Sequence, residues 1–286
     1  MPRLNFENPN FENPAIRKME REEKEQENIE KLESLIREIS WKLKKEGVPV
    51  AEDLRIDVNA YSHVYSEKEI NKDKELVEEC LSEWYPGLSQ EEIKKERMKA
   101  DGEKLEMLSK AIFTRGLGED FIVARSSLYD DIKNKADNII LEKSTGNIVC
   151  ALDDIGESKG SRYKEKVEKV MAKNKKEDGV KLKYGLKMEE NEKGENKLCL
   201  SKVENVPLFY LVLPKDHIDK GLEELVPSLG QLSEHEEKLF NYFLGSILYQ
   251  VNFLELERGL NPALKDRLSR FKEILQRFNS KNSLSK

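Results

Sequence analysis

Three aspartates lie at the open end of one predicted β-hairpin, where its first strand begins and its second strand ends. No other residues of this chain are better placed to do chemistry together. The segment from Asp137 to Ile155 reads as two strands joined by a tight turn, in which Asp137 opens the first strand and Asp153 and Asp154 close the second. In an antiparallel hairpin, the start of one strand lies beside the end of the next. The sequence therefore predicts a cluster of carboxylates at one edge of an otherwise apolar sheet.

Carboxylates brought this close repel one another, and a cation stabilises their ionised forms. Mg²⁺ and Mn²⁺ prefer carboxylate oxygens and water to nitrogen and sulfur ligands, so the pattern indicates a magnesium or manganese site. A metal placed there lowers the pKa of bound water and screens the charge of a phosphodiester. The alternative interpretation is structural: Asp153 and Asp154 end a strand before Gly156, and Asp137 is a strand-entry residue.

The composition is that of a folded protein with long, charged helix faces. Of the 286 residues, 37% are hydrophobic and 37% are charged, and the formal net charge is -6. An acidic chain of this kind contacts nucleic acid only through a local basic patch. Three cysteines without a CxxC pair argue against a disulfide framework or a zinc site. Together with the lack of an apolar signal region or membrane segment, they predict a cytoplasmic protein.

Apolar periodicity predicts helices at both ends of the chain and a mixed sheet between them. Helical spacing runs from Ala15 to Lys45 and recurs in two C-terminal helices that begin near Ser233 and Asn261. Capping boxes are expected at Ser89 and at Ser233, each followed by a glutamate three residues later. Strand-like runs occur at residues 121–124, 137–155, 181–188, 198–200 and 207–213, with a helix at 161–176. Residues 209–213 are almost continuously apolar, which predicts a central strand covered on both faces.

These elements predict an α/β protein with a mixed central sheet of four to five strands flanked by helices. We expect an extended tail at 1–14, a mainly helical region at 15–100, an α/β core at 101–220, and a helical hairpin packed on that core at 221–286. The tail holds the sequence Asn-Phe-Glu-Asn-Pro twice. This repeat predicts either a segment docked on the body through its phenylalanines or a short motif that binds a protein partner.

A basic segment directly follows the acidic hairpin. Residues 159–187 contain eleven lysines and arginines against four acidic residues, a local reversal of sign in an acidic chain. The phosphate backbone of a nucleic acid binds such patches independently of its nucleotide sequence. The segment therefore predicts DNA or RNA contacts through Lys159, Arg162, Lys166, Lys169 and Lys173. The alternative is an exposed lysine-rich helix that favours solubility. Tyr163 and Tyr184 are candidates either for base stacking or for half-buried packing.

The order of these elements, with Asp137 on one strand and an acid at the end of the next, resembles the core of PD-(D/E)XK nucleases over about residues 105–215. The resemblance implies that Asp137 and Asp153 hold divalent metal and that a helix supplies a glutamate, for which Glu119 is the candidate. It also implies a lysine at the position that Ile155 occupies here. Lys159, just beyond the strand, is the nearest replacement to position water or phosphate, and Lys181 and Lys183 on the following strand are others.

The sequence thus predicts a metal-dependent nuclease-like protein that acts on nucleic acid phosphodiesters. The alternative is a catalytically inactive core of the same kind that binds nucleic acid or protein as a scaffold, because Ile155 stands where the lysine is expected. Other chemistry finds little support. The chain has no Gly-Lys-Ser/Thr phosphate loop, no GxSxG elbow, and no GxGxxG after a strand.

Overall fold

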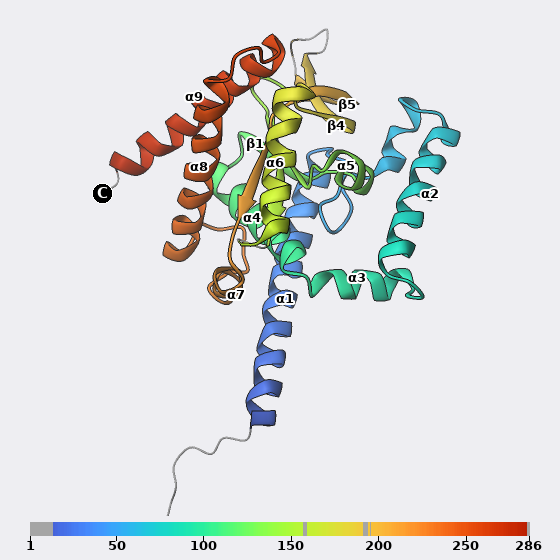
Figure 1. Cartoon of the computed structure of the whole chain (residues 1–286), viewed down its shortest axis with the longest axis vertical. Coiled ribbons are helices and arrows are strands. Elements are labelled where there is room, and N and C mark those ends of the chain that lie inside the picture. The colour runs from blue at the N-terminus through green and yellow to red at the C-terminus, as the bar shows by residue number, and fades with distance from the viewer. Residues whose placement is uncertain (1–13, 157–158, 191–193, 195, 285–286) are drawn as a thin grey trace, which may run out of the picture.

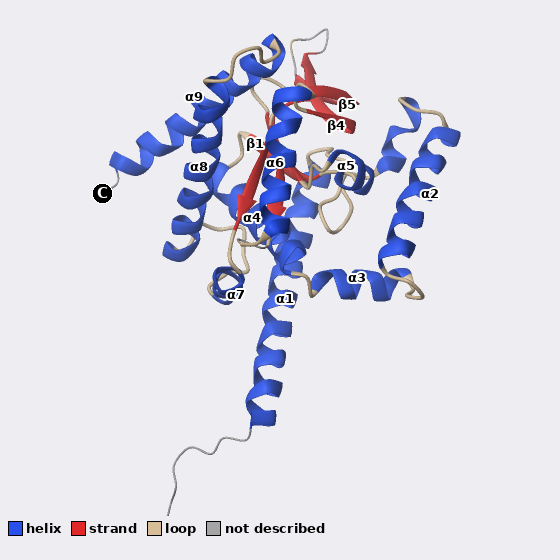
Figure 2. Ribbon diagram, viewed as in Figure 1, coloured by secondary structure: helices blue, strands red, loops and turns tan. Residues whose placement is uncertain are grey.

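The computed structural model describes residues 14–156, 159–190, 194 and 196–284. It confirms the predicted α/β class: a mixed four-stranded sheet with strand order β1-β2-β3-β6 lies among helices, beside a separate two-stranded sheet (Figure 2). The four strands are β1 (Phe121–Arg125), β2 (Asn138–Glu142), β3 (Asn147–Ile155) and β6 (Leu208–Val212). The tail repeat falls outside the described residues except for Pro14, which begins the first helix.

The predicted hairpin is present as β2 and β3. Their antiparallel register pairs Asn138 with Leu152, and the Asp137 N–H donates to the Leu152 carbonyl over 2.8 Å. On the other side of β2, Arg125 at the end of antiparallel β1 pairs with Asn138, and β6 runs parallel to β3. The carboxyl ends of β1, β3 and β6 therefore meet the start of β2 at one end of the sheet.

Helices cover both faces of this sheet (Figure 1). On one face, α4 (Asp101–Leu117) packs against β1 and β3, and the Ser109 hydroxyl lies 3.3 Å from the Asp154 carboxylate. α6 (Ser161–Lys176) packs against β3 and β6, with the Lys166 amine 3.6 Å from the Asp153 carboxylate. Because successive residues of a strand point to opposite faces, α4 and α6 lie on opposite sides of the sheet.

Two C-terminal helices, α8 (Glu234–Glu255) and α9 (Pro262–Leu284), pack on each other and on the sheet. The Phe209 ring of β6 stacks on Phe271 of α9 at a centroid distance of 5.7 Å. The Gln250 side chain of α8 accepts from the Tyr210 N–H at 3.0 Å and donates to the Tyr210 carbonyl at 2.8 Å. The prediction that residues 209–213 form a central strand is therefore wrong. β6 is at the edge of the sheet, and helices rather than another strand bury it.

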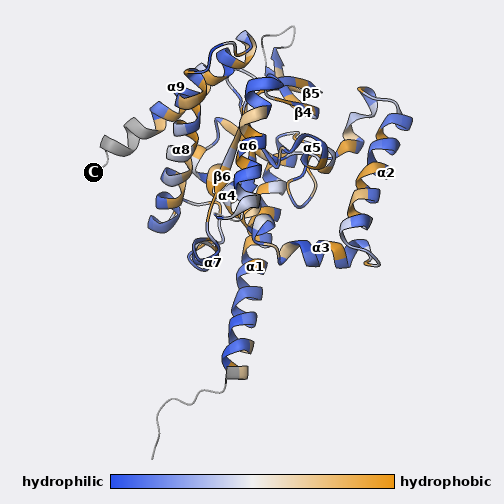
Figure 3. Ribbon diagram, in the orientation of Figure 1, coloured by the Kyte–Doolittle hydropathy of each residue, from blue (hydrophilic) through white to orange (hydrophobic). Residues whose placement is uncertain are grey.

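The N-terminal helix α1 (Pro14–Lys45) has two halves with different surroundings. Its second half is buried through residues such as Leu32, Leu35 and Ile39, and it packs against α4 and α7 (Lys215–Glu223). The first half projects from the body and is mainly hydrophilic (Figures 1 and 3). No helix in the described part of the chain is long and apolar enough to cross a lipid bilayer.

Three more helices follow α1: η1 (Val58–His63), α2 (Glu67–Trp84) and α3 (Gln90–Met98). α2 and α3 both begin with a capping box, formed by Ser66 with Glu69 and by Ser89 with Glu92. Each box satisfies two backbone N–H groups that lack partners within the helix. The capping boxes predicted at Ser89 and at Ser233 are thus confirmed.

The two-stranded sheet of β4 (Val180–Glu190) and β5 (Asn196–Val206) is attached to α5 (Leu128–Asn134) by a buried carboxylate. Asp130 accepts from the N–H groups of Lys183 at 2.8 Å and Tyr184 at 3.0 Å. The Tyr184 ring is buried, packs edge-on against Tyr61 at 5.0 Å, and its hydroxyl donates to Asp73 at 2.7 Å. Tyr184 is therefore a packing residue, and it is not available for base stacking.

A close approach between α4 and α8 gives a stability prediction. A methyl group on Gly116 would lie 2.5 Å from the Phe240 ring, whereas nothing lies within 4 Å of one on Gly245 of α8. We expect Gly116→Ala to lower the free energy of unfolding by roughly 1–3 kcal/mol through overpacking. Gly245→Ala is the matched control, and helix propensity should raise its stability by up to about 1 kcal/mol. Urea denaturation checks both changes, and equal shifts of the two variants would contradict the close contact.

Candidate metal site and adjoining pocket

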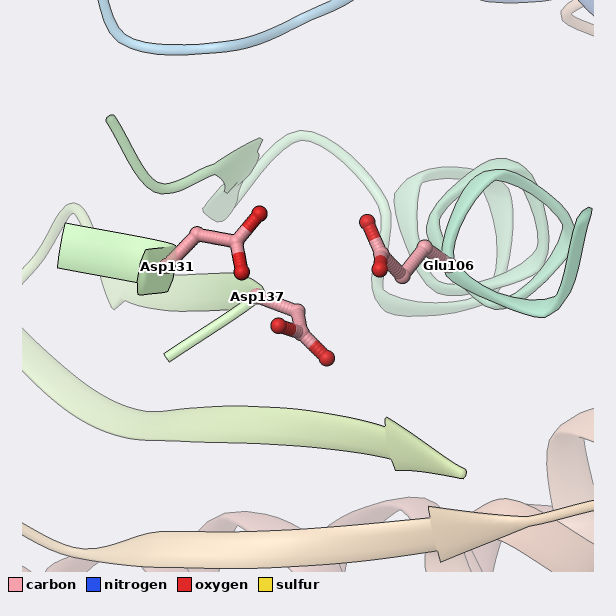
Figure 4. A group of neighbouring side chains, drawn as sticks. All are labelled: Glu106, Asp131 and Asp137. Atoms are coloured by element: carbon pink, nitrogen blue, oxygen red, sulfur yellow. The ribbon is translucent and has the colours of Figure 1, made fainter. Parts of the chain in front are cut away.

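Three acidic side chains converge at the end of the sheet where β2 begins (Figure 4). Glu106 comes from α4, Asp131 from α5, and Asp137 from the residue before β2, and each offers a carboxylate oxygen within 4.8 Å of the other two. Among the residues that the structure describes, they form the group of ligand-type side chains that meets this spacing. Hereafter these three residues are called the acidic triad.

Local structure explains why Asp131 and Asp137 come together. Ser127 caps α5 by accepting from the Asp130 N–H at 3.0 Å, and the helix ends at Asn134, followed by Lys135 with a left-handed backbone at φ of 61°. The chain then reverses through Ala136 and enters β2, so that the first turn of the short helix and the strand entry lie next to each other. Asp130 anchors this connection to β4.

Glu106 reaches the same point because α4 carries a polar stripe toward the end of the sheet. Glu106, Ser109 and Lys110 follow at three- and four-residue spacing, and all three are buried. The apolar residues Leu105, Leu108 and Ile112 beside them hold the helix against the core. Charged side chains buried on a packed helix face need partners, and the sheet end supplies them.

Three arginines partly neutralise the acidic triad. The Arg125 guanidinium, 1% exposed, contacts both Glu103 and Glu106, and Arg55 lies 2.9 Å from Asp131 and 3.5 Å from Glu106. The third, Arg97, lies 3.8 Å from Asp131 and 2.7 Å from Glu103. These contacts use one oxygen each of Glu106 and Asp131, while the Asp154 N–H donates to one oxygen of Asp137 at 2.7 Å. Within the described residues, no hydrogen bond is made to the second oxygen of these three carboxylates.

Two buried aspartates of this cluster have raised pKa values, Asp137 and Asp154. Burial raises the pKa of Asp137 well above its usual value, and the neighbouring carboxylates of Glu106 and Asp131 raise it further. Burial and Glu106 together raise the pKa of Asp154 to about 7. Within the described chain, no ion pair joins a cationic side chain to Asp137 or Asp154. Such carboxyl groups take up either protons or a cation, and the all-oxygen donor set fits Mg²⁺ or Mn²⁺.

Asp154 and Lys110 meet through an asparagine on the same face of the sheet. The Asn138 amide donates to Asp154 Oδ2 and its carbonyl oxygen accepts from Lys110 Nζ. Burial lowers the pKa of the Lys110 amine well below its usual value, and Arg125 lowers it further. Asp154 Oδ1 is also buried, and it has no hydrogen-bond partner. The structure thus places an amine and a carboxylate with an unpaired oxygen next to the acidic triad.

A cavity of about 660 Å³ opens at the carboxyl ends of β3 and β6. Its wall includes Asp154, Lys159, Tyr163, Lys166 and Lys215, together with the first residues of α4, and it is hereafter called the lysine pocket. Asp154 adjoins both features, because its backbone N–H donates to Asp137 and it is one of the residues that line the pocket. A second cavity of about 250 Å³ lies beside Arg55, Arg97 and Arg125, where the arginines are already paired with acids.

The structure separates some of the predicted site residues. Asp137 lies in the acidic triad, whereas Asp153 points to the opposite face of β3 from Asp154 and pairs with Lys166. The expectation that Glu119 joins Asp137 is wrong. Glu119 precedes β1 at its Phe121 end, which pairs with Glu142 at the far end of the sheet, and its exposed side chain pairs with Lys42 at 2.9 Å.

The predicted basic residues also occupy different positions. Lys159 and Lys166 line the lysine pocket, whereas Lys169 and Lys173 pair along α6 with Glu165 at 2.6 Å and Glu177 at 3.0 Å. Arg162 belongs to the first turn of α6, and its side chain is outside the described part of the structure. The basic segment therefore divides into a pocket wall and a locally paired helix surface.

Sequence reasoning missed Glu106, Asp131 and Lys110. The available signal was the placement of Glu106 and Lys110 at helical spacing among apolar residues of a helix that is otherwise expected to be buried. For Asp131 there was only its position in a polar stretch before the hairpin.

Comparisons with known proteins give no further assignment. No protein-family model, no curated protein and no solved structure matches this chain.

Proposed function

We propose that this protein cleaves nucleic acid phosphodiesters with the help of a divalent metal ion held by Glu106, Asp131 and Asp137. The observation that carries the proposal is the acidic triad, with carboxylate oxygens within 4.8 Å of one another, beside a pocket lined by lysines. The metal, when bound, screens the charge of a phosphodiester and lowers the pKa of bound water. Lysines in the adjoining wall attract the same phosphate.

The remaining groups have roles that follow from their contacts. Lys159, Lys166 and Lys215 bind and orient the phosphate, because their side chains line the pocket. Asp154 is placed to accept a proton, since it is at the junction of the triad and the pocket and has a pKa of about 7, close to the pH of the cell. Asn138 fixes the Asp154 carboxylate and holds the Lys110 amine beside it.

The resemblance to PD-(D/E)XK nucleases supports this proposal in a revised form. The elements α4, β1, β2, β3, α6 and β6 follow one another in this order, with α5 inserted after β1 and the β4–β5 sheet inserted after α6. They have an acid on the helix, an acid at the start of one strand and an acid at the end of the next. Glu106 takes the place proposed for Glu119. Asp154 takes the place proposed for Asp153, because its side chain lies on the face of the sheet that α4 covers, whereas Asp153 lies on the face that α6 covers. Lys110 supplies an amine that the strand lacks at the buried Ile155.

The experiment that tests the proposal is cleavage of mixed single-stranded and duplex DNA and RNA by the full chain. We expect cleavage with Mg²⁺ or Mn²⁺ and none with EDTA, and calorimetric titration with Mn²⁺ should detect binding in the absence of substrate. Absence of both cleavage and Mn²⁺ binding would reject the proposal.

One observation favours a second candidate, a non-catalytic nucleic-acid-binding core. Arg55 and Arg125 already contact two members of the acidic triad, and a buried carboxylate paired with arginine can have a purely structural role. This candidate retains the lysine pocket but needs no metal. Binding of nucleic acid without Mn²⁺ uptake and without cleavage would favour it.

A further inference from the structure

The wall of the lysine pocket continues into an aromatic surface. Tyr163 of α6 lines the pocket and is half-buried. On α8, Tyr242 is 48% exposed, Tyr249 71% and Phe253 44%. Seven residues separate Tyr242 from Tyr249 and four separate Tyr249 from Phe253, so the three rings follow one face of the helix. Exposed rings in such a row require an explanation, because large apolar side chains are usually covered.

Contacts at both ends show that α6 and α8 lie side by side across β6. α6 and α8 both pack against β6, and the Tyr242 hydroxyl donates to the Val212 carbonyl at the end of that strand over 3.0 Å. At the other end of the helices, the Lys175 amine of α6 lies 4.7 Å above the Phe253 ring of α8 and also pairs with Glu257. The rings therefore form one surface, which starts at the lysine pocket and follows α8.

The pocket has the properties of a phosphate site. Lys166 and Lys215 pair with Asp153 and Asp101, whereas no ion pair of Lys159 occurs among the described residues. α4 and α7 begin in the pocket wall at Ala100 and Pro214, neither of which has a side chain that could cap the first N–H groups. Unsatisfied N–H groups at a helix start bind anions.

An independent feature of the same pocket points to a ligand. Asp154 is one of the residues that line the pocket, is 2% exposed, and has one buried side-chain oxygen without any hydrogen-bond partner. A buried polar atom without a partner costs stability, so it indicates a group that completes the site. The lysines of the wall require an anion, as a backbone phosphate offers, and bound water beside that phosphate is a donor of the kind that Asp154 lacks.

We propose that the lysine pocket and the rings of Tyr163, Tyr242, Tyr249 and Phe253 together bind single-stranded nucleic acid, with a backbone phosphate in the pocket and bases stacked on the rings. The inference rests on the proposed function and names its substrate class. A duplex keeps its bases paired and stacked inside, so it cannot use the rings, whereas the unpaired bases of a single strand can.

Charge and length both fit this ligand. α6, which borders the rings, carries seven lysines and arginines against two glutamates, and nucleic acid binds to such surfaces. The α8 row from Tyr242 to Phe253 spans about 16 Å, because a helix rises about 1.5 Å per residue. This is roughly the length of four to five bases stacked at 3.4 Å.

The test measures binding without cleavage, by fluorescence anisotropy of short labelled oligonucleotides in EDTA. The wild-type protein should bind single-stranded DNA or RNA more tightly than a duplex of the same sequence. Tyr249→Ala should weaken single-strand binding about five-fold or more, whereas Tyr249→Trp should retain it, because both tyrosine and tryptophan offer a stacking face. The exposed position of Tyr249 makes loss of folding an implausible cause, and circular dichroism of both variants checks this.

A pair of lysine variants tests the pocket. Lys159→Gln should weaken binding and lower the slope of log affinity against log salt by about 0.7, the value for one phosphate contact with a single strand. Lys18→Gln, the matched control at the projecting start of α1, has a side chain that is 76% exposed and should leave binding unchanged. Equal effects of the two variants would overturn the assignment of the pocket.

The outcomes separate this inference from the proposed function. Single-strand binding that depends on Tyr249, with neither Mn²⁺ binding nor cleavage in Mg²⁺ or Mn²⁺, supports the inference and rejects the nuclease. Cleavage with unchanged binding by Tyr249→Ala overturns the inference and leaves the nuclease in place. Failure of the wild-type protein to bind any oligonucleotide overturns the inference as well.

Discussion

Asp137→Asn is expected to reduce metal-dependent cleavage by a factor on the order of 10³, since a metal ion contributes several kcal/mol to phosphodiester cleavage and about 1.4 kcal/mol corresponds to a factor of ten. Asp137 belongs to the acidic triad and has one oxygen that no described residue engages. An asparagine side chain retains an oxygen that can accept from the Asp154 N–H, so the hairpin should keep its geometry. The measurement is the initial rate of cleavage in Mg²⁺ and in Mn²⁺.

Glu119→Gln is the matched control for this change. Glu119 was also expected to bind metal, but its side chain is 85% exposed and pairs with Lys42 at the far end of the sheet. Its surface ion pair contributes little to stability, so both cleavage and folding should remain as in the wild type. Mn²⁺ should raise the melting temperature of the wild type and of Glu119→Gln, but not that of Asp137→Asn. A normal cleavage rate for Asp137→Asn would remove the acidic triad as the metal site.

Asp154→Asn is expected to make the metal-free protein more stable than the wild type at about pH 8, and the difference should disappear toward about pH 4. The folded state raises the pKa of Asp154 from 3.8 to about 7. The folded protein therefore binds this proton more tightly than the unfolded chain does. The contribution of Asp154 to the free energy of unfolding accordingly falls as pH rises from about 4 to about 7, and then stays constant.

The size of this effect follows from the pKa and from the neighbours of Asp154. One pKa unit corresponds to about 1.4 kcal/mol, so the upper limit is about 4 kcal/mol. The pKa of about 7 already includes the attraction between Lys110 and the ionised Asp154 carboxylate, so the expected difference is on the order of a few kcal/mol, up to that limit. The Asn138 amide loses a charged acceptor but can still donate to the oxygen of the new side chain.

Urea denaturation of the two proteins in EDTA, across this pH range, gives the measurement. The readout is the difference between variant and wild type, because Lys110 has the opposite sign: its pKa is lowered, so its contribution to stability rises with pH until its unfolded pKa is reached. Glu119→Gln serves again as the control. Lys42 lowers the pKa of the Glu119 carboxyl in the wild type, so removal of this carboxyl should affect stability only at the acidic end of the pH range. A difference between Asp154→Asn and wild type that does not change with pH would contradict the raised pKa.

Local sequence patterns determined the elements and the acids of the hairpin. Alternation and turn residues were enough to place Asp137 beside the end of β3, because a hairpin joins neighbours in the chain. Capping boxes at Ser89 and Ser233 fixed two helix starts, since both partners lie within four residues. The α/β class followed from the order of these elements.

Only the tertiary structure decided which acids meet. Glu106 and Asp131 reach Asp137 because α4 packs on one face of the sheet and α5 is anchored to β4 through Asp130, and both arrangements join residues far apart in the chain. Glu119 lies just before the start of β1, whereas the site lies at the end of β1. The direction of this strand therefore places Glu119 far from the site. The apolar run of β6 correctly predicted a buried strand. It did not indicate whether another strand or a helix lies at the outer edge, where the Gln250 side chain of α8 binds the backbone of Tyr210.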